Sequence, residues 1–147
     1  MLAAELKAAW ERAFRGQGFE VEIYPTFSPE TWGGGFLPFR VTAAPHALIG
    51  LGLTQPAISG FEISFRGEGA QLRTASGRST TEFALQCIGG ATLALLCEGQ
   101  YIDDQNGIVC GGSEALGTAI SETRAFVASA DEQEKVSHPF PGWEKLE

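Results

Sequence analysis

Four apolar residues recur at every fourth position near the middle of the chain: Phe83, Cys87, Ala91 and Leu95. Because a helical turn takes about 3.6 residues, this spacing places their side chains on one face of a helix. Ser79 and Glu82 precede the repeat with the spacing of a capping box, which satisfies free N–H groups at a helix start. The pattern predicts a helix over residues 80–97, although Gly89 and Gly90 at its centre each cost about 1 kcal/mol relative to alanine. A strand after the glycine pair is the alternative interpretation.

A short acidic hairpin is expected after this helix, followed by a second long helix. Tyr101-Ile102 and residues 108–110 have the composition of strands, and residues 103–107 have that of a turn that contains Asn-Gly. The second helix is expected to begin on a serine cap at Ser113. Its buried stripe is expected to contain six residues: Leu116, Ala119, Ile120, Thr123, Phe126 and Val127.

The N-terminal half is interpreted as one helix followed by strands. The helix has one apolar stripe, formed by Leu2, Leu6, Trp10 and Phe14. Residues 19–24 and 61–66 alternate between apolar and polar side chains, which is typical of strands with one buried face. Residues 36–42 are predicted to form a further strand, which Pro38 restricts to a sheet edge or a bulge.

The segment 47–54 is rich in leucine and isoleucine and is expected to be a strand buried on both faces. Residues 55–60 are interpreted as a turn, and this short connection predicts antiparallel pairing between 47–54 and 61–66. Residues 67–78 are polar and contain glycine, so we expect a loop there with a short strand near 71–73.

The order of helix, strands and helices predicts an α+β fold. We expect a mainly antiparallel sheet of about four to six strands packed against an N-terminal helix and two C-terminal helices. A length of 147 residues is typical of one domain, which we assign to residues 1–136. Residues 137–147 are interpreted as a C-terminal tail whose last two residues are a candidate cloning remnant.

Negative charge is concentrated in the C-terminal half. Residues 1–78 carry seven acidic and seven basic residues, whereas residues 79–147 carry eleven acidic and three basic residues, so this half holds the whole net charge of −8. A field of that sign repels nucleic acid and anionic membranes and attracts a basic protein surface. A solvated acidic surface that keeps the protein soluble is the simpler alternative. Because neither a membrane span nor a secretory signal is visible, we expect a cytoplasmic location.

The side chains that could support catalysis or bind metal form no recognisable motif. Cys87, Cys97 and Cys110 lack the spacing of a disulfide framework or a metal site, and we interpret them as small apolar side chains in a reducing compartment. The histidines, His46 and His138, have no nucleophile motif beside them. We therefore predict no catalytic residues, no metal site and no cofactor, and an enzyme is the less favoured interpretation.

Six residues are candidates for contact with a partner protein: Trp32, Tyr101, Asp103, Asp104, Glu114 and Glu122. The two aromatic residues are candidate anchors, because tryptophan and tyrosine often dominate interface energies, although Trp32 could instead fill the core. The four acids would attract a basic partner. Asp103 and Asp104 are poorly placed for joint catalysis, since adjacent strand residues point to opposite faces, and a turn at a sheet edge is the favoured interpretation.

The hairpin and its flanking helices also form a familiar pattern. Its segments are Leu95-Leu96-Cys97-Glu98-Gly99, Tyr101-Ile102-Asp103-Asp104-Gln105-Asn106-Gly107 and Ser113-Glu114-Ala115-Leu116. Over about fifty residues this pattern resembles the C-terminal unit of small bacterial immunity-type proteins, which protect cells from toxins. The resemblance implies a bacterial protein that inhibits a cognate toxin.

Three functions are consistent with these patterns. The favoured one is a non-enzymatic protein-binding module, in its most specific form an immunity protein that inhibits a toxin through an acidic surface. The second is a small-ligand-binding protein or enzyme with a pocket between helix and sheet. The third is a structural or dimer-forming domain, in which strands such as 47–54 join two copies. The expected partner is another protein with a basic surface, and neither nucleic acid nor a membrane.

Overall fold

The computed structural model describes residues 3–23, 35–49, 57–66, 69–74 and 80–130. The helices in these ranges are α1 (Ala3–Gly16), α2 (His46–Ile49), α3 (Thr80–Leu96) and α4 (Gly112–Ser129). The strands are β1 (Glu20–Ile23), β2 (Gly35–Ala43), β3 (Ala57–Arg66), β4 (Gly69–Arg73), β5 (Gln100–Asp103) and β6 (Ile108–Gly111). The α+β class is confirmed, while Trp32, Ser79, His138 and the proposed tail lie outside the described residues.

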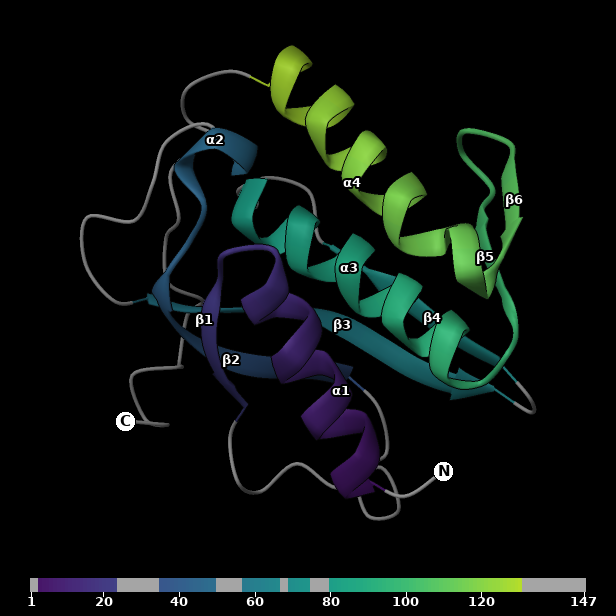
Figure 1. Cartoon of the computed structure of the whole chain (residues 1–147), viewed down its shortest axis with the longest axis horizontal. Coiled ribbons are helices and arrows are strands. Elements are labelled where there is room, and N and C mark those ends of the chain that lie inside the picture. The colour runs from purple at the N-terminus through teal and green to yellow at the C-terminus, as the bar shows by residue number, and fades with distance from the viewer. Residues whose placement is uncertain (1–2, 24–34, 50–56, 67–68, 75–79, 131–147) are drawn as a thin grey trace.

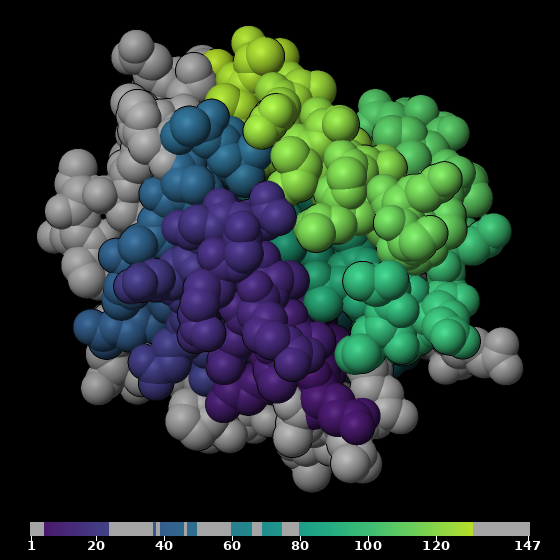
Figure 2. Space-filling model, viewed as in Figure 1, coloured from purple at the N-terminus to yellow at the C-terminus, as the bar shows by residue number. Residues whose placement is uncertain are grey.

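The strands form two separate antiparallel arrangements. The first is a four-stranded sheet in the order β1-β2-β3-β4, and the second is the hairpin β5-β6. Helices α1 and α3 lie side by side on one face of the sheet, and α4 packs along α3 (Figure 1). In the space-filling view α1 and α4 cover most of α3, whose C-terminal part stays visible beside the hairpin (Figure 2). Of the helices described, none has the length and apolar character needed to cross a membrane.

The core lies between the sheet and the helices α1 and α3. Alternate residues of the first three strands are buried there: Ile23, Leu37, Phe39, Val41, Phe61 and Ile63. The described part of the predicted α1 stripe is also buried: Leu6, Trp10 and Phe14. The Trp10 ring contacts Phe39 and Phe61 edge-on, with centroid distances of 6.4 and 5.8 Å, and its Nε1–H donates to the Gly89 carbonyl at 3.0 Å. This side chain therefore joins α1, the sheet and α3.

Helix α3 is buried on two sides, and its central glycine pair makes this possible. Leu85 and Ile88 belong to the core under the sheet, whereas Cys87 and Ala91 pack against α4. A Cβ atom on Gly89 would lie 2.9 Å from Cζ of Phe61, closer than two carbon atoms can approach without movement. The helix predicted over 80–97 is confirmed, because close packing against the sheet offsets the low helix propensity of glycine.

The strand predicted over 47–54 is wrong where the structure describes it. Residues 46–49 form the short helix α2, and the N–H groups of Leu48 and Ile49 both donate to the Pro45 carbonyl, at 2.9 and 3.1 Å. The fixed φ of proline is compatible with the first turn of a helix, which explains why the apolar run begins as a helix. The predicted pairing with 61–66 is also wrong, because β3 pairs with β2 and β4.

The start of β3 also differs from the prediction, whereas the strand that follows it was predicted. β3 begins at Ala57, inside the segment 55–60 that was interpreted as a turn. The short strand predicted near 71–73 is confirmed as β4, which pairs with β3 over five residues. The resulting β3-β4 hairpin makes β4 the last strand of the sheet.

Strand β2 is an interior strand, so the prediction that Pro38 restricts it to an edge or a bulge is wrong. Pro38 pairs in register with Gly60 of β3. On the other side β1 reaches only to Ile23, which pairs with Phe39, one residue short of Pro38. In the described chain, no residue of β1 lies opposite Pro38 to accept a hydrogen bond from a backbone N–H at this position. The missing N–H of proline is therefore tolerated.

Helix α4 begins at Gly112, and the predicted serine cap at Ser113 is wrong. Gly111 is the N-cap residue, and no side chain accepts a capping hydrogen bond there. A Cβ atom on Gly112 would lie 2.7 Å from the Ala94 carbonyl oxygen, because the first turn of α4 touches the last turn of α3. Ala119 and Thr123 of the predicted stripe are fully buried, and its other four residues are partly buried.

Candidate functional site

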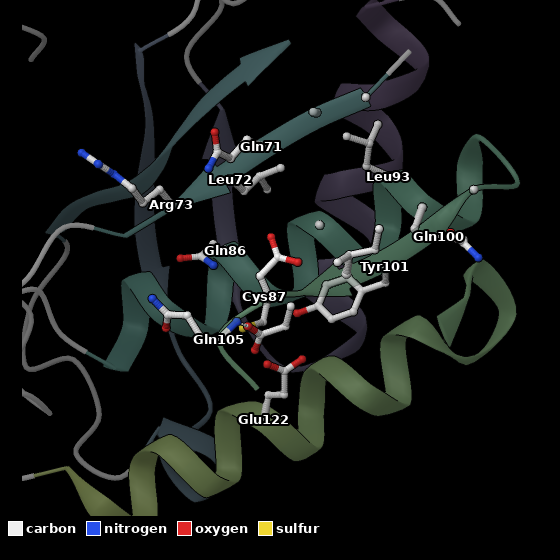
Figure 3. A pocket seen from close by; sticks show the side chains of 18 of the residues that line it. Gln71, Leu72, Arg73, Gln86, Cys87, Leu93, Gln100, Tyr101, Gln105 and Glu122 are labelled. Carbon is white, nitrogen blue, oxygen red and sulfur yellow. Dashed lines mark hydrogen bonds between the residues drawn. The ribbon is translucent and has the colours of Figure 1, made fainter. Parts of the chain in front are cut away.

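A groove with a volume of about 600 Å³ opens between the sheet and the hairpin. One wall is β4, the floor belongs to α3, and the opposite wall is β5 with the turn that follows it. Glu122 reaches the groove from α4. Figure 3 shows the polar ends of Tyr101, Cys87 and Glu122 converging in the groove, although the three residues come from three different elements.

The groove runs along the backbone edges of two strands. All five residues of β4 and all four residues of β5 line it. Successive strand side chains point to opposite faces, so a cavity on one face would be lined by alternate residues only. Contact with every residue indicates that the groove follows the strand edges. These edges are free in the described chain, because β4 pairs only with β3 and β5 only with β6.

Tyr101 lies in the wall of the groove above Gly90 of α3. A Cβ atom on Gly90 would lie 3.3 Å from Cε2 of the tyrosine ring and 3.9 Å from Cδ2 of Leu72. The missing side chain therefore lets the hairpin approach α3 at the bottom of the groove. Burial, together with the neighbouring Cys87 and Glu122, raises the pKa of the Tyr101 hydroxyl, so this group stays protonated at neutral pH.

Cys87 is the cysteine that approaches the polar cluster, and its surroundings keep it unreactive. Burial is the main cause that raises the pKa of the Cys87 thiol, to about 12, and the charges of Glu122 and Asp103 add to the effect. A thiol with this pKa is protonated at neutral pH, and the thiolate is the nucleophilic form. A nucleophilic role for Cys87 therefore has no support in the geometry.

Asp103 is held in place by the turn that it begins. Its Oδ1 accepts hydrogen bonds from the backbone N–H groups of Gln105 and Asn106, at 3.0 and 3.3 Å. Its Oδ2 accepts from Nδ2 of Asn106 at 2.7 Å. The interaction with Glu122 is the largest cause that lowers the pKa of Asp103, and these hydrogen bonds lower it further. The carboxylate is thus fixed and ionised next to Glu122.

Glu122 is the second carboxyl group of this pair, and its pKa shifts in the opposite direction. Burial, followed by the hydrogen-bond contact and the charge of Asp103, raises the pKa of Glu122 to about 7. Its Oε1 atom is buried and has no hydrogen-bond partner among the described residues. Two neighbouring carboxyl groups resist ionising together, because each new negative charge repels the other. The pair therefore holds about one proton near neutral pH, which a bound cation would displace.

Negative charge dominates the described lining of the groove. Asp103, Asp104 and Glu122 are its acidic members, and Arg73 is the basic residue among them. The Arg73 side chain is engaged with Glu62 of β3, with Nε and Nη2 at 3.0 and 2.9 Å from Oε2. Because Arg73 pairs with Glu62, the described lining holds no other basic side chain that could pair with the three acids of the groove.

Substitution of Glu122 by glutamine is expected to flatten the pH dependence of stability between about pH 4.5 and 7. In this window the folded chain still holds the Glu122 proton that the unfolded chain has released, so stability falls as the pH rises. The depressed pKa of Asp103 acts at lower pH, where its stabilising contribution is lost as the pH falls. Tyr101 and Cys87 face the same cluster and remain neutral throughout. Urea unfolding at pH 5, 6, 7 and 8 measures the slope.

The control for this measurement is Glu114→Gln, a substitution on the same helix outside the lining of the groove. This variant should keep the wild-type slope. If Glu122→Gln also keeps the wild-type slope, a raised pKa of Glu122 is contradicted.

The structure brings four of the six candidate residues together. Tyr101, Asp103, Asp104 and Glu122 line the groove, whereas Glu114 is exposed in the first turn of α4 and does not line it. The interpretation of 103–107 as a turn is confirmed. The acidic side chain that meets the Asp103 carboxylate is Glu122 of α4. Sequence reasoning missed Cys87 in this cluster, because it was assigned to the apolar stripe that contacts α4.

The described residues form no metal site, and the chain has no match among the known proteins compared. Among the described residues, no three His, Cys, Asp or Glu side chains are grouped so that they could hold a metal ion. The chain matches no protein-family model, no curated protein and no solved structure in the comparisons made.

Proposed function

We propose that the chain is a non-enzymatic protein-binding module whose groove receives a basic side chain of its partner. The observation that carries this proposal is the Oε1 atom of Glu122, which is buried without a hydrogen-bond partner beside the ionised Asp103. An unsatisfied buried oxygen costs about 1–3 kcal/mol, and a donor from a bound partner removes that cost. A guanidinium group fits best, because its fork of N–H donors can serve two carboxyl groups at once.

The distribution of charge along the chain supports the same role. The C-terminal half carries the whole net charge of −8, and α4 and the hairpin both belong to it. Such a field speeds encounter with a basic surface, while close contacts in the groove determine how long the complex lasts. Inhibition of a cognate toxin, which the resemblance to immunity-type proteins implies, is one specific form of this function and stays a proposal.

A small-ligand-binding protein or acid–base enzyme is the second candidate, favoured by the groove volume and by the opposite pKa shifts of Asp103 and Glu122. Paired catalytic carboxyl groups that cleave glycosides stand about 5–9.5 Å apart, with the reacting bond or a water between them. Asp103 and Glu122 are instead within hydrogen-bond contact, which leaves no room for a reacting atom between them. This contact argues against the spacing of a glycosidase pair.

Titration with N-acetyl-arginine methylamide tests the proposed function. The chain is expected to bind this compound in a saturable way, because its guanidinium can occupy the space next to Glu122 and Asp103. N-acetyl-citrulline methylamide has nearly the same shape without the charge and should bind at least tenfold more weakly. Two-dimensional NMR of the labelled protein measures both affinities and locates the response.

The expected response is concentrated on three residues: Tyr101, Asp103 and Glu122. Equal binding of the arginine and citrulline compounds would contradict a site for a basic group. A response spread over all exposed acids, Glu114 included, would also contradict it, since general attraction of a cation by an acidic surface predicts that result.

A further inference from the structure

We propose that the groove is a strand-addition site, in which an extended segment of a partner protein adds to the free edge of β4 and places one basic side chain against Asp103 and Glu122. The assignment of a basic residue to this segment depends on the function proposed above. The strand addition rests on separate observations, which concern the backbone of β4, the opposite wall and the floor of the groove.

The first observation is that, among the described residues, no strand pairs with the outer edge of β4. β4 is the last strand of the sheet, and its whole length from Gly69 to Arg73 lines the groove. Natural edge strands usually block added strands with proline, a bulge or a lysine. The segment Gly69–Arg73 contains neither proline nor lysine, and its pairing with β3 continues without a bulge. Arg73, at its end, is directed to Glu62.

The second observation is that the groove extends along the whole of β4 and is large enough to enclose a ligand. Five residues of extended chain span about 17 Å, which is the length of β4 along the groove. The volume of about 600 Å³ is in the range of sites that enclose a ligand rather than of shallow surface depressions. The facing wall is the free edge of β5, so the segment would lie between two strand edges over the floor of α3.

The third observation concerns the direction of the side chains. In β4, Ala70 and Leu72 are partly buried and pack against the core, whereas Gly69, Gln71 and Arg73 are exposed. A strand added in plane with β4 would alternate in the same way. Its inward side chains would face α3 and lie toward the face of β5 that carries Tyr101 and Asp103, where the Tyr101 ring already covers Gly90.

This alternation defines the chemistry of the segment. One inward position takes arginine or lysine, because the described lining carries three acids and its single base is paired with Glu62. In the added segment, the positions two residues before and two residues after the basic residue also point inward. They take small or apolar side chains, since Leu72, Leu93 and Ala94 form the neighbouring surface of the groove. The outward positions are in solvent and carry little preference.

Selection from a displayed library of random nine-residue peptides, followed by backbone N-methylation of the selected peptides, tests the proposal. A peptide that adds to a strand edge turns every second N–H toward the edge. Methylation of the frame whose N–H groups face β4 should therefore weaken binding at least tenfold, and methylation of the other frame, which faces β5, should weaken it less. Hydrogen exchange should slow at alternate amides of residues 69–73 when the unmethylated peptide is bound.

The outcomes separate the two proposals. Equal effects of the two methylation frames, or a library without a peptide that binds tighter than about 100 µM, would overturn strand addition. If the frames differ but replacement of the basic residue by citrulline has no effect, strand addition stands and the site for a basic group fails. Protection of β4 amides at high protein concentration without peptide would assign the edge to a second copy of the chain and would also overturn the proposal.

Discussion

Replacement of Trp10 by alanine is expected to lower the free energy of unfolding by about 3–5 kcal/mol, the range for a fully buried large aromatic side chain. Trp10 is 0% exposed and contacts the rings of Phe39 and Phe61, so its removal leaves a cavity at the centre of the core. It also removes the hydrogen bond to the Gly89 carbonyl. Urea unfolding followed by circular dichroism measures the loss, which should shift the midpoint without changing the slope.

The matched control is Trp10→Phe, which keeps an aromatic ring but removes the indole N–H. Its expected loss is about 1–2 kcal/mol, because one hydrogen bond contributes about 0.5–1.5 kcal/mol and the smaller ring leaves only part of the cavity. The phenylalanine variant should therefore be more stable than the alanine variant by at least about 1 kcal/mol. A loss of less than about 1 kcal/mol for Trp10→Ala would contradict the role of this side chain as the junction of α1, the sheet and α3.

The parts of the fold that depend on local spacing were predictable from the sequence. The four-residue repeat of α3, the stripe of α1 and the alternation in 61–66 are set by backbone periods that tertiary contacts do not alter. The segment 47–54 shows where this reasoning fails. A short apolar run is compatible with a buried strand and with a buried helix. In this chain the run follows Pro45, whose carbonyl accepts the first hydrogen bonds of helix α2.

Contacts between distant elements were beyond the sequence patterns. Gly89 and Gly90 appeared as a weakness of one helix, but the reason for them lies in Phe61 and Tyr101, which are distant in the chain. In the same way, the sequence shows Asp103 only beside Asp104, which points to the other face of the strand, and does not indicate that the Asp103 carboxylate meets Glu122 of α4. Glu122 does carry a local signal, because it lies next to the buried Thr123 and three residues after the buried Ala119. An acid at the margin of a buried stripe is a reasonable candidate for a perturbed carboxyl group.

Replacement of Glu122 by lysine is expected to weaken binding of the basic peptides selected above by at least about 30-fold, which corresponds to 2 kcal/mol or more. The new ammonium group would stand beside Asp103 and occupy the place proposed for the partner's cation. It would also repel that cation directly. Stability should change little at pH 7, since the ion pair with Asp103 replaces a pair of carboxyl groups that repel each other. Fluorescence polarisation measures the affinity, and urea unfolding excludes loss of the fold.

The matched control is Glu114→Lys, because it makes the same change of net charge on the same helix but outside the lining of the groove. If the groove binds the cation, Glu114→Lys should reduce affinity less than threefold at physiological salt, where a distant exposed charge is screened within about 8 Å. Equal losses in the two variants would mean that only the overall field of the C-terminal half attracts the peptides. The difference between two variants of identical charge therefore separates a site from a surface potential, which a salt titration of the wild-type protein alone cannot do.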